Sequence, residues 1–308
     1  MRNDEETTGG RARPDPSRRR SPPPLHIVTL LVSALILFLA GSAWLALYPG
    51  VPADLGGVPN LDSRATRVSI PVGGADHLDG FLILGSRRAL VVIFHGYGRD
   101  HTRAWRYGRF LSKAGFSVLA ADFRSSRAAD RKPTTLGFYE VEDARAVLDW
   151  TRSDARTRAL PLALLGESLG GSVALAVAAE HPEVRAVIAD CPFVSGARAL
   201  DDALERWAHV PRWPAASITA AMAERLTGHD PRALDVLAAA RRLDRTPVLF
   251  IASERDDRLS AGETRDLWRA AGAKDPIWIL ADCGHNQAWL RHRAEYERRV
   301  LAFLESRR

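Results

Sequence analysis

The sequence predicts an α/β fold, in which a mostly parallel sheet is wound with helices. Short apolar runs alternate with helical segments from residue 89 to residue 190, which is the rhythm of a parallel sheet with crossover helices. The stretch Gly166–Gly171 (GESLGG) joins an apolar run to a small-residue helix. Polar residues capable of chemistry follow several predicted strands, at the edge where open parallel sheets place their sites.

Local hydrophobic patterns place the elements in order. Residues 66–72 and 78–84 resemble an antiparallel opening hairpin. The alternating part is then predicted as strands at 89–94, 117–122, 162–166 and 184–190, with helices from about 102, at 139–151 and at 168–179. Asp122 and Arg124 follow the second of these strands and are expected to form a structural ion pair.

The alternation stops after residue 190. The segment up to residue 247 is predicted to be helical, and its Trp207 and Trp213 could line an acyl pocket or simply pack the segment. Apolar runs at 247–252 and 276–280 predict two more buried strands, and an amphipathic helix is expected from about Trp289.

Composition excludes several classes of protein. The 308 residues are 46% hydrophobic, enough for one large domain or two small ones. The net charge of +6 is spread without a basic stripe of interleaved aromatics, so no nucleic-acid partner is expected. No metal or cofactor is expected either, because H-E-x-x-H, P-loop and C-x-x-C motifs are absent from the sequence. Cys191 and Cys283 do not make a disulfide framework, and are either buried hydrophobes or an extracytoplasmic pair.

The N-terminal region predicts a membrane anchor. Residues 1–24 are rich in Arg, Pro, Ser and Gly and are expected to be a disordered tail. The 21 residues from Ile27 to Leu47 carry no charge, and a helix of that length spans about 30 Å, the thickness of a bilayer core. Three arginines at 18–20 precede the span, whereas 49–62 has no Lys or Arg. The positive-inside rule then puts the N-terminus in the cytoplasm.

Residues 25–48 are therefore predicted to be a single-pass signal anchor in the cell inner membrane, followed by a linker at 49–62. The remaining domain, 63–308, would stand outside the cytoplasm. Two alternatives remain open for the apolar segment: a cleaved signal peptide, whose apolar region is usually shorter, or a buried core helix.

The motif G-x-S-x-G around Ser168 predicts a nucleophile. A serine at a sharp strand-to-helix turn has strained backbone geometry, and its neighbours two positions away must be small. Its hydroxyl then projects above the sheet. The backbone N–H of Leu169 is placed by the same geometry to bind an oxyanion.

With these motifs the chain resembles the α/β-hydrolase family, from Thr66 to Leu304. The matching features are the strand–G-x-S-x-G–helix, the His95-Gly96 pair after a strand, an acid after a late strand, and Gly284-His285. The segment from Asp122 to Asp143 is similar to a bacterial branch near prolyl-oligopeptidase-like and lysophospholipase-like serine hydrolases. The resemblance implies helices on both faces of the sheet, a small helical lid at about 193–246, and a structural role for His95.

The remaining site residues are assigned on this resemblance. His285 is expected to be the general base and Tyr97 N–H the second oxyanion donor. The family pattern G-x-x-D-x-x-V-P puts Asp256 in register as the acid, although a serine replaces both the glycine and the proline. Asp257 and Asp190 remain alternatives for the acid.

The function expected is a membrane-anchored serine hydrolase. It would cleave small-molecule or lipid esters, or thioesters, through an acyl-enzyme on Ser168, His285 and Asp256. The alternatives are a serine peptidase, a lysophospholipase-type lipid hydrolase, and a non-catalytic binding protein that uses the same fold.

Overall fold

The computed structural model describes residues 25–49, 63–74, 76–86, 89–126, 132–208 and 212–307. The chain divides into a short unit, Met1–Phe38, and a compact unit, Leu39–Arg308. The predicted tail at 1–24 and nearly all of the predicted linker at 49–62 lie outside the described residues.

The apolar N-terminal segment forms one long helix, α1 (Leu25–Leu47), of 23 residues. Among the described residues it is the one helix long and apolar enough to cross a membrane. Only 17% of its most apolar window is buried, which does not fit the alternative of a core helix. By length and composition, a membrane span and a signal sequence both remain open.

An eight-stranded, mostly parallel sheet forms the centre of the compact unit, in the order β1-β2-β4-β3-β5-β6-β7-β8. Only β2 runs against the other strands, because it pairs antiparallel with both β1 and β4. The strands are β1 (Thr66–Pro71), β2 (His77–Ile83), β3 (Leu90–Phe94), β4 (Ser117–Ala121), β5 (Leu162–Glu167), β6 (Val184–Asp190), β7 (Val248–Ser253) and β8 (Trp278–Leu280). The predicted hairpin and parallel strands are confirmed, with the last strand starting two residues later than expected.

The helices of the compact unit connect these strands. Between β3 and β6 lie α2 (His101–Lys113), the 3-10 turn η1 (Arg124–Ser126), α3 (Phe138–Ser153) and α4 (Leu169–Ala178). The segment between β6 and β7 is helical as predicted, with α5 (Gly196–Ala208), α6 (Arg212–Thr227) and α7 (Val236–Ala240). The chain ends with α8 (Ala261–Ala270), α9 (Ala288–Arg291) and α10 (Arg293–Glu305). The side chains of Trp207 and Trp213 lie outside the described part of the structure.

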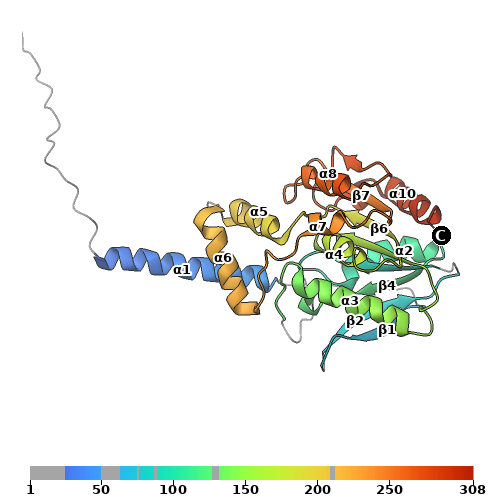
Figure 1. Cartoon of the computed structure of the whole chain (residues 1–308), viewed down its shortest axis with the longest axis horizontal. Helices are drawn as coiled ribbons and strands as arrows, with labels where there is room; N and C mark the ends of the chain where they lie inside the picture. The colour runs from blue at the N-terminus through green and yellow to red at the C-terminus, as the bar shows by residue number, and fades with distance from the viewer. Residues whose placement is uncertain are drawn as a thin grey trace, which may run out of the picture. The chain divides into compact units, whose positions relative to one another are not determined.

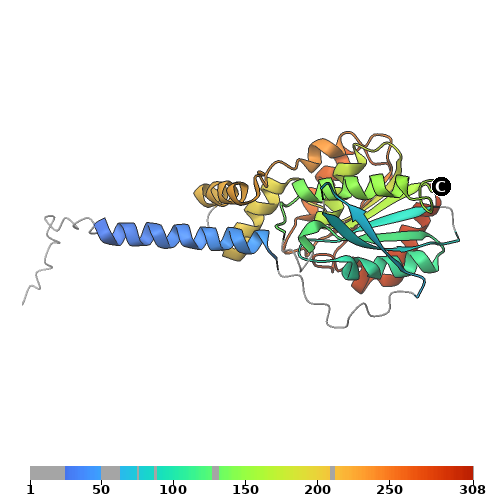
Figure 2. The ribbon, with the colours of Figure 1, turned by 90° about the horizontal axis from the view of Figure 1, so that it is seen from below.

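Helices cover both faces of the sheet (Figures 1 and 2). One core contains residues of α3, α4, α7 and α8, and the other contains residues of α2, α9 and α10. Successive strand residues alternate between the two cores: Val92 belongs to the first, whereas Val91 and Ile93 belong to the second. This alternation explains why the central strands read as continuous apolar runs in the sequence.

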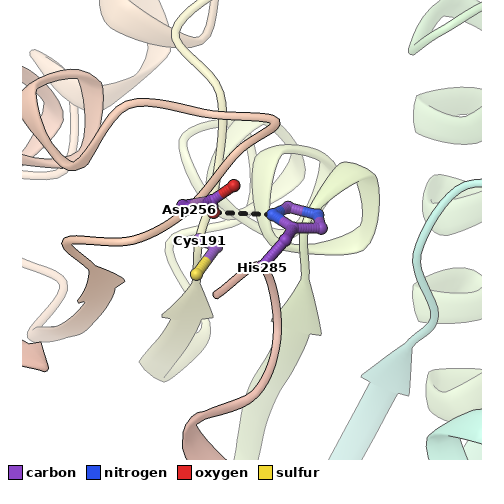
Figure 3. A group of neighbouring side chains, drawn as sticks. All are labelled: Cys191, Asp256 and His285. Atoms are coloured by element: carbon purple, nitrogen blue, oxygen red, sulfur yellow. Dashed lines mark hydrogen bonds and ion pairs between the residues drawn. The ribbon is translucent and has the colours of Figure 1, made fainter. Parts of the chain in front are cut away.

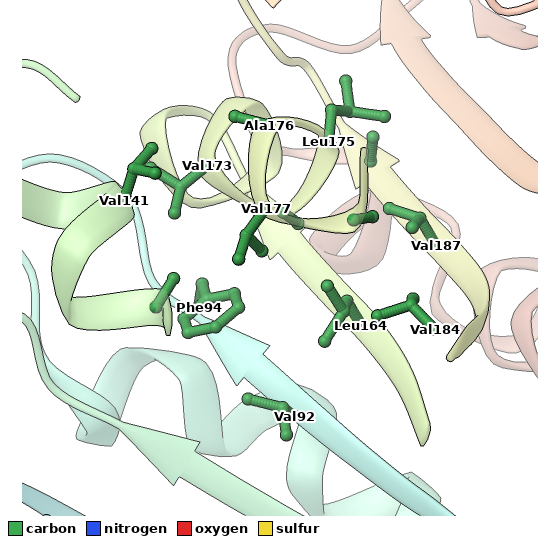
Figure 4. Packing of buried hydrophobic residues seen from close by; sticks show 14 of the residues in the cluster. Val92, Phe94, Val141, Leu164, Val173, Leu175, Ala176, Val177, Val184 and Val187 are labelled. Carbon is green, nitrogen blue, oxygen red and sulfur yellow. The ribbon is translucent and has the colours of Figure 1, made fainter. Parts of the chain in front are cut away.

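Helix α4 is the most deeply buried helix of the fold, since every residue from Leu169 to Ala178 is buried. Figure 4 shows its side chains Val173 and Val177 packed above Phe94 of β3 and Leu164 of β5. The small residues of α4 let it approach the sheet closely. The turn that precedes α4 is thereby held between β5 and a fully packed core.

The expected ion pair between Asp122 and Arg124 is wrong. Asp122 lies 2.8 Å from the Nδ1 atom of His101, and Arg124 donates through Nε to Asp143 at 2.7 Å. Asp143 is fully buried and Asp122 is nearly so, and each carboxylate has its own partner because burial without one is costly. Arg124 therefore binds Asp143, which a short-range reading of the sequence does not reveal.

Asp190, at the end of β6, carries a buried carboxyl group. The side chain is inaccessible to solvent. Its Oδ2 atom accepts a hydrogen bond from the Tyr296 hydroxyl of α10 at 3.1 Å, while Oδ1 has no partner among the described residues. Burial raises the pKa of Asp190 to about 6, because the charged form loses its hydration.

We predict that Asp190→Asn changes how stability depends on pH. The raised pKa means that the wild-type carboxyl stabilises the fold fully below its unfolded pKa of about 4, and loses this contribution as pH rises through about 6. The variant should therefore gain stability relative to wild type between pH 4 and pH 8, by up to about 3 kcal/mol. Urea unfolding of both proteins at pH 4 and pH 8 measures the difference in their free energies of unfolding. If this difference is the same at the two pH values, the prediction is contradicted.

Candidate active site

Ser168 lies at the turn between β5 and α4 with positive backbone φ, 53°, and ψ of −122°. This conformation is strained for a residue with a side chain. The glycines on either side permit it: a Cβ atom on Gly166 would lie 2.1 Å from the Gly170 carbonyl oxygen, and one on Gly170 would lie 2.3 Å from the Phe94 carbonyl oxygen. The Ser168 amide also donates to the Asp190 carbonyl at 2.8 Å. The structure thus forms the predicted turn.

The structure brings Ser168, His285 and Asp256 together as a chain of hydrogen bonds. Nε2 of His285 is 2.9 Å from Oγ of Ser168, and Nδ1 of His285 is 2.7 Å from Oδ2 of Asp256. Figure 3 shows the imidazole and the carboxylate facing one another. With Nδ1 donating to the carboxylate, Nε2 is left as an acceptor for the serine proton.

Asp256 is fixed by the loop that follows β7. Its Oδ1 atom accepts from the backbone amides of Arg258 at 2.8 Å and Leu259 at 2.9 Å, and its side chain is only 2% exposed. These amides satisfy the oxygen that His285 does not use. Asp257 is exposed instead.

The alternative acid, Asp190, contacts Tyr296 rather than His285. Of the three candidate carboxylates, the structure places Asp256 against the imidazole.

The turn after β3 lies beside Ser168. A Cβ atom on Gly96 would be 3.5 Å from Cβ of Ser168. His95 is buried and bonds at Nδ1 to the Gly96 carbonyl at 2.9 Å, while Nε2 accepts from the Phe123 amide at 3.1 Å. Its contacts are those of a residue that fixes the turn. Leu169 is the first residue of α4, so its amide has no partner within the helix.

The Tyr97 side chain makes a hydrogen bond that the sequence did not indicate. Its hydroxyl donates to the Ala46 carbonyl oxygen at 2.7 Å, and Ala46 lies in the last turn of α1, within the compact unit. The Thr134 amide donates to the Leu47 carbonyl at 2.8 Å. The last carbonyl groups of a helix have no hydrogen-bond donor within that helix. At the end of α1, two of these carbonyls accept hydrogen bonds from Tyr97 and Thr134.

A buried polar network supports the turn from behind. The Glu167 side chain is 1% exposed and contacts the Arg106 guanidinium. It also accepts from the Tyr107 hydroxyl at 2.9 Å. Arg106 and Glu167 are 61 positions apart in sequence, so no local motif could have revealed this pair.

Cys191 lies next to Asp256 and His285 (Figure 3). One ligand atom from each of the three lies within 4.8 Å of the others, a spacing that could hold a metal ion. However, burial raises the pKa of the Cys191 thiol well above its usual value, and Nδ1 of His285 already bonds to Asp256. The arrangement therefore favours an acid–base pair over a metal site. Cys191 and Cys283 are both buried and free.

A cleft of about 480 Å³ opens beside Ser168 and His285. Tyr97 borders it, and most of the residues in its wall are charged. Its arginines are Arg99, Arg103, Arg255, Arg258 and Arg291. No local pattern in the sequence indicated this cluster of arginines, because they come from three separate segments of the chain.

Three comparisons relate the chain to known proteins. A family model described as serine aminopeptidase, S33, matches residues 85–241. An uncharacterised Bacillus subtilis protein, YqkD, is 28% identical over 218 residues, which cover 70% of this chain and 71% of that protein. A monoacylglycerol lipase of Mycolicibacterium smegmatis is 35% identical over 115 residues, covering 35% of this chain and 39% of the lipase.

Among solved structures, the Pyrococcus furiosus esterase Pf2001 superposes with a TM-score of 0.63 at 23% identity, over 79% of this chain and 91% of that esterase. At this level of identity the comparison shows a shared fold. The family match covers more than half of the chain and includes the turn at Ser168. The chain therefore belongs to the S33 serine aminopeptidase family of α/β hydrolases, and is an enzyme of the hydrolase class.

Proposed function

We propose that the protein is a serine hydrolase that cleaves carboxylic ester or thioester bonds with Ser168, His285 and Asp256 as its catalytic triad. The observation that carries this proposal is the continuous chain of hydrogen bonds from Ser168 through His285 to Asp256. It starts from a serine whose backbone is strained at φ 53°. The hydroxyl, the base and the acid each have the partner that nucleophilic catalysis requires.

In the proposed mechanism, Oγ of Ser168 attacks the acyl carbon while Nε2 of His285 accepts its proton. The acyl C–O bond of an ester, or the C–S bond of a thioester, then breaks, and the imidazolium gives the proton to the leaving alkoxide or thiolate. A water molecule, activated by His285, hydrolyses the acyl-enzyme and regenerates the serine. Asp256 holds the imidazole in the productive tautomer and stabilises its cation, because Arg258 and Leu259 amides keep the carboxylate in place.

The oxyanion of the tetrahedral intermediate needs backbone donors. We assign this role to the amides of Leu169 and Tyr97. Leu169 N–H is free of intrahelical bonding at the start of α4, and the turn containing Tyr97 is fixed beside Ser168 by His95. One such donor contributes about 10²–10³ in rate.

Esters fit the site better than peptides with a free amino terminus. An aminopeptidase must bind a cationic α-ammonium group, whereas this cleft is walled by five arginines. Its one deeply buried acid, Glu167, already binds Arg106. A non-catalytic scaffold is disfavoured because it would have no need for the aligned serine, histidine and aspartate.

We further propose that α1 anchors the enzyme in a membrane. Its uncharged span is preceded by arginines at 18–20, so the N-terminus would stay in the cytoplasm and the catalytic domain would stand outside. The last turn of α1 accepts a hydrogen bond from Tyr97. If this turn lies at the outer membrane surface, the Tyr97 turn lies close to that surface as well.

Ser168→Ala should abolish hydrolysis, because the variant lacks the attacking oxygen. We expect turnover of p-nitrophenyl butyrate to fall by roughly 10⁴-fold or more and covalent labelling by a fluorophosphonate to disappear. Mass spectrometry of the labelled protein measures the second effect. Circular dichroism serves as the folding control, and full labelling of the alanine variant would refute the assignment.

Asp256→Asn should lower kcat by about 10³–10⁴, because an amide cannot stabilise the imidazolium and favours the wrong tautomer. Asp257→Asn is the matched control, since this neighbouring side chain is exposed. It should change kcat only a few-fold. Steady-state kinetics on the same ester tests both variants, and the opposite ranking would move the acid to Asp257.

The anchor predicts a specific topology. Protease added to spheroplasts should digest a C-terminal tag, because the catalytic domain lies outside the cytoplasm. The mature chain should retain its N-terminus and remain in the membrane fraction after carbonate washing. A protected tag would place the domain in the cytoplasm. A soluble chain that lacks the first forty or so residues would make the segment a cleaved signal peptide.

A further inference from the structure

The cleft beside Ser168 has an unusual balance of charge. Five arginines line it, against three acidic residues: Glu167, Asp257 and Asp282. Two of the acids also contact groups outside the wall. Glu167 contacts the Arg106 guanidinium, and Asp282 lies 2.8 Å from Nε2 of His292. The five arginines of the wall outnumber its three acids, so the cleft is cationic.

Arg103 shows this excess most clearly. Its Nε atom is buried and has no hydrogen-bond partner among the described residues, and its nearest acid, Glu167, is 3.7 Å away. Burial and the like charge of Arg106 lower the pKa of Arg103. Arg103 thus has an ion-pair partner but no hydrogen-bond acceptor for Nε, and a bound anion would supply that acceptor and lower the desolvation cost.

Other arginines of the cleft are also open to a ligand. In the described part of the chain, no carboxylate lies within ion-pair distance of Arg99 or Arg255. Arg255 is exposed on the loop that also carries Asp256, and Arg99 follows the turn that carries Tyr97. The two arginines thus flank the proposed site from the ends of β7 and β3.

Apolar surface is scarce in the same cleft. Its described wall contains the Tyr97 ring but no leucine, isoleucine, valine, phenylalanine or methionine. Hydrocarbon chains bind in pockets lined mainly by apolar side chains. The part of the substrate that occupies this cleft is therefore polar.

We propose that this cleft recognises an oxyanion, either a carboxylate or a phosphate, carried by the ester substrate next to its scissile bond. This proposal rests on the proposed function of Ser168. Arginine forks bind both anions through paired, charge-assisted hydrogen bonds. The anion takes no part in the bond changes. Ser168 bonds to the acyl carbon, the alcohol leaves with the serine proton, and water then releases the acid, so the bound anion only orients the ester.

Two matched pairs of substrates test the proposal. They also distinguish recognition of a carboxylate from recognition of a phosphate. Mono-p-nitrophenyl glutarate and p-nitrophenyl valerate differ by a terminal carboxylate on the acyl side. Butyrylglycerol phosphate and butyrylglycerol differ by a phosphate on the alcohol side. We expect kcat/KM to be at least about tenfold higher for the anionic member of one pair. If the neutral ester is hydrolysed as well as its anionic counterpart in both pairs, the proposal is overturned.

Variants connect this preference to the arginines. Arg103→Gln and Arg255→Gln should each lower the anionic-to-neutral ratio of kcat/KM by about three- to tenfold. Arg269→Gln is the matched control, because Arg269 is exposed on α8 and bonds to Asp266 at 2.8 Å, away from the cleft. It should leave the ratio unchanged. A ratio that responds equally to all three variants would reflect net charge alone and refute the cleft as its source.

A labelling measurement separates failure of this proposal from failure of the proposed function. Inorganic phosphate should slow fluorophosphonate labelling of Ser168, and Arg103→Gln should weaken that protection. Absence of labelling would reject the serine hydrolase itself. Normal labelling that phosphate does not slow, at about 0.05 M salt where charges are least screened, would reject only the anion site.

Discussion

The strained backbone of Ser168 is the constraint on which the site depends. A side-chain-bearing residue at φ 53° costs about 1–3 kcal/mol and persists only where the surroundings enforce it. Here β5 ends directly before the turn and α4, buried along its whole length, begins directly after it. Gly166 and Gly170 let these elements approach to distances that a Cβ atom would forbid. Core packing on both faces of the sheet thereby holds one hydroxyl in place.

The partners of Ser168 come from the ends of other strands. Asp256 follows β7 and His285 follows β8, and both strands lie on the same side of β5 in the sheet. The sheet aligns these ends, and short loops complete the geometry. Two backbone amides hold Asp256, and His95 holds the turn on the other side of the serine. Hydrogen bonds within these loops therefore hold the acid, and the turn beside the serine, in position.

Charge is organised in two layers around this site. Beneath the serine, Glu167 and Asp190 are buried, and Arg106, Tyr107 and Tyr296 surround them with donors. Above it, the cleft is walled by arginines without an equal number of free acids. The lower layer stabilises the turn, since a buried carboxylate without donors would destabilise it. The upper layer faces the substrate and, on our proposal, selects an anionic ester.

The sequence by itself determined the order of strands and helices, the hairpin, the helical insert and the place of Ser168. These features follow from periodicity and from steric rules that act over a few residues. The choice of Asp256 over Asp257 also came from a local register, and the structure places it against His285. Only the tertiary structure decided which distant side chains meet. It paired Arg124 with Asp143 instead of Asp122, joined Arg106 to Glu167, and gathered arginines from three segments around one cleft. Such contacts depend on how strands are ordered in the sheet, and spacing along the chain carries no record of that order.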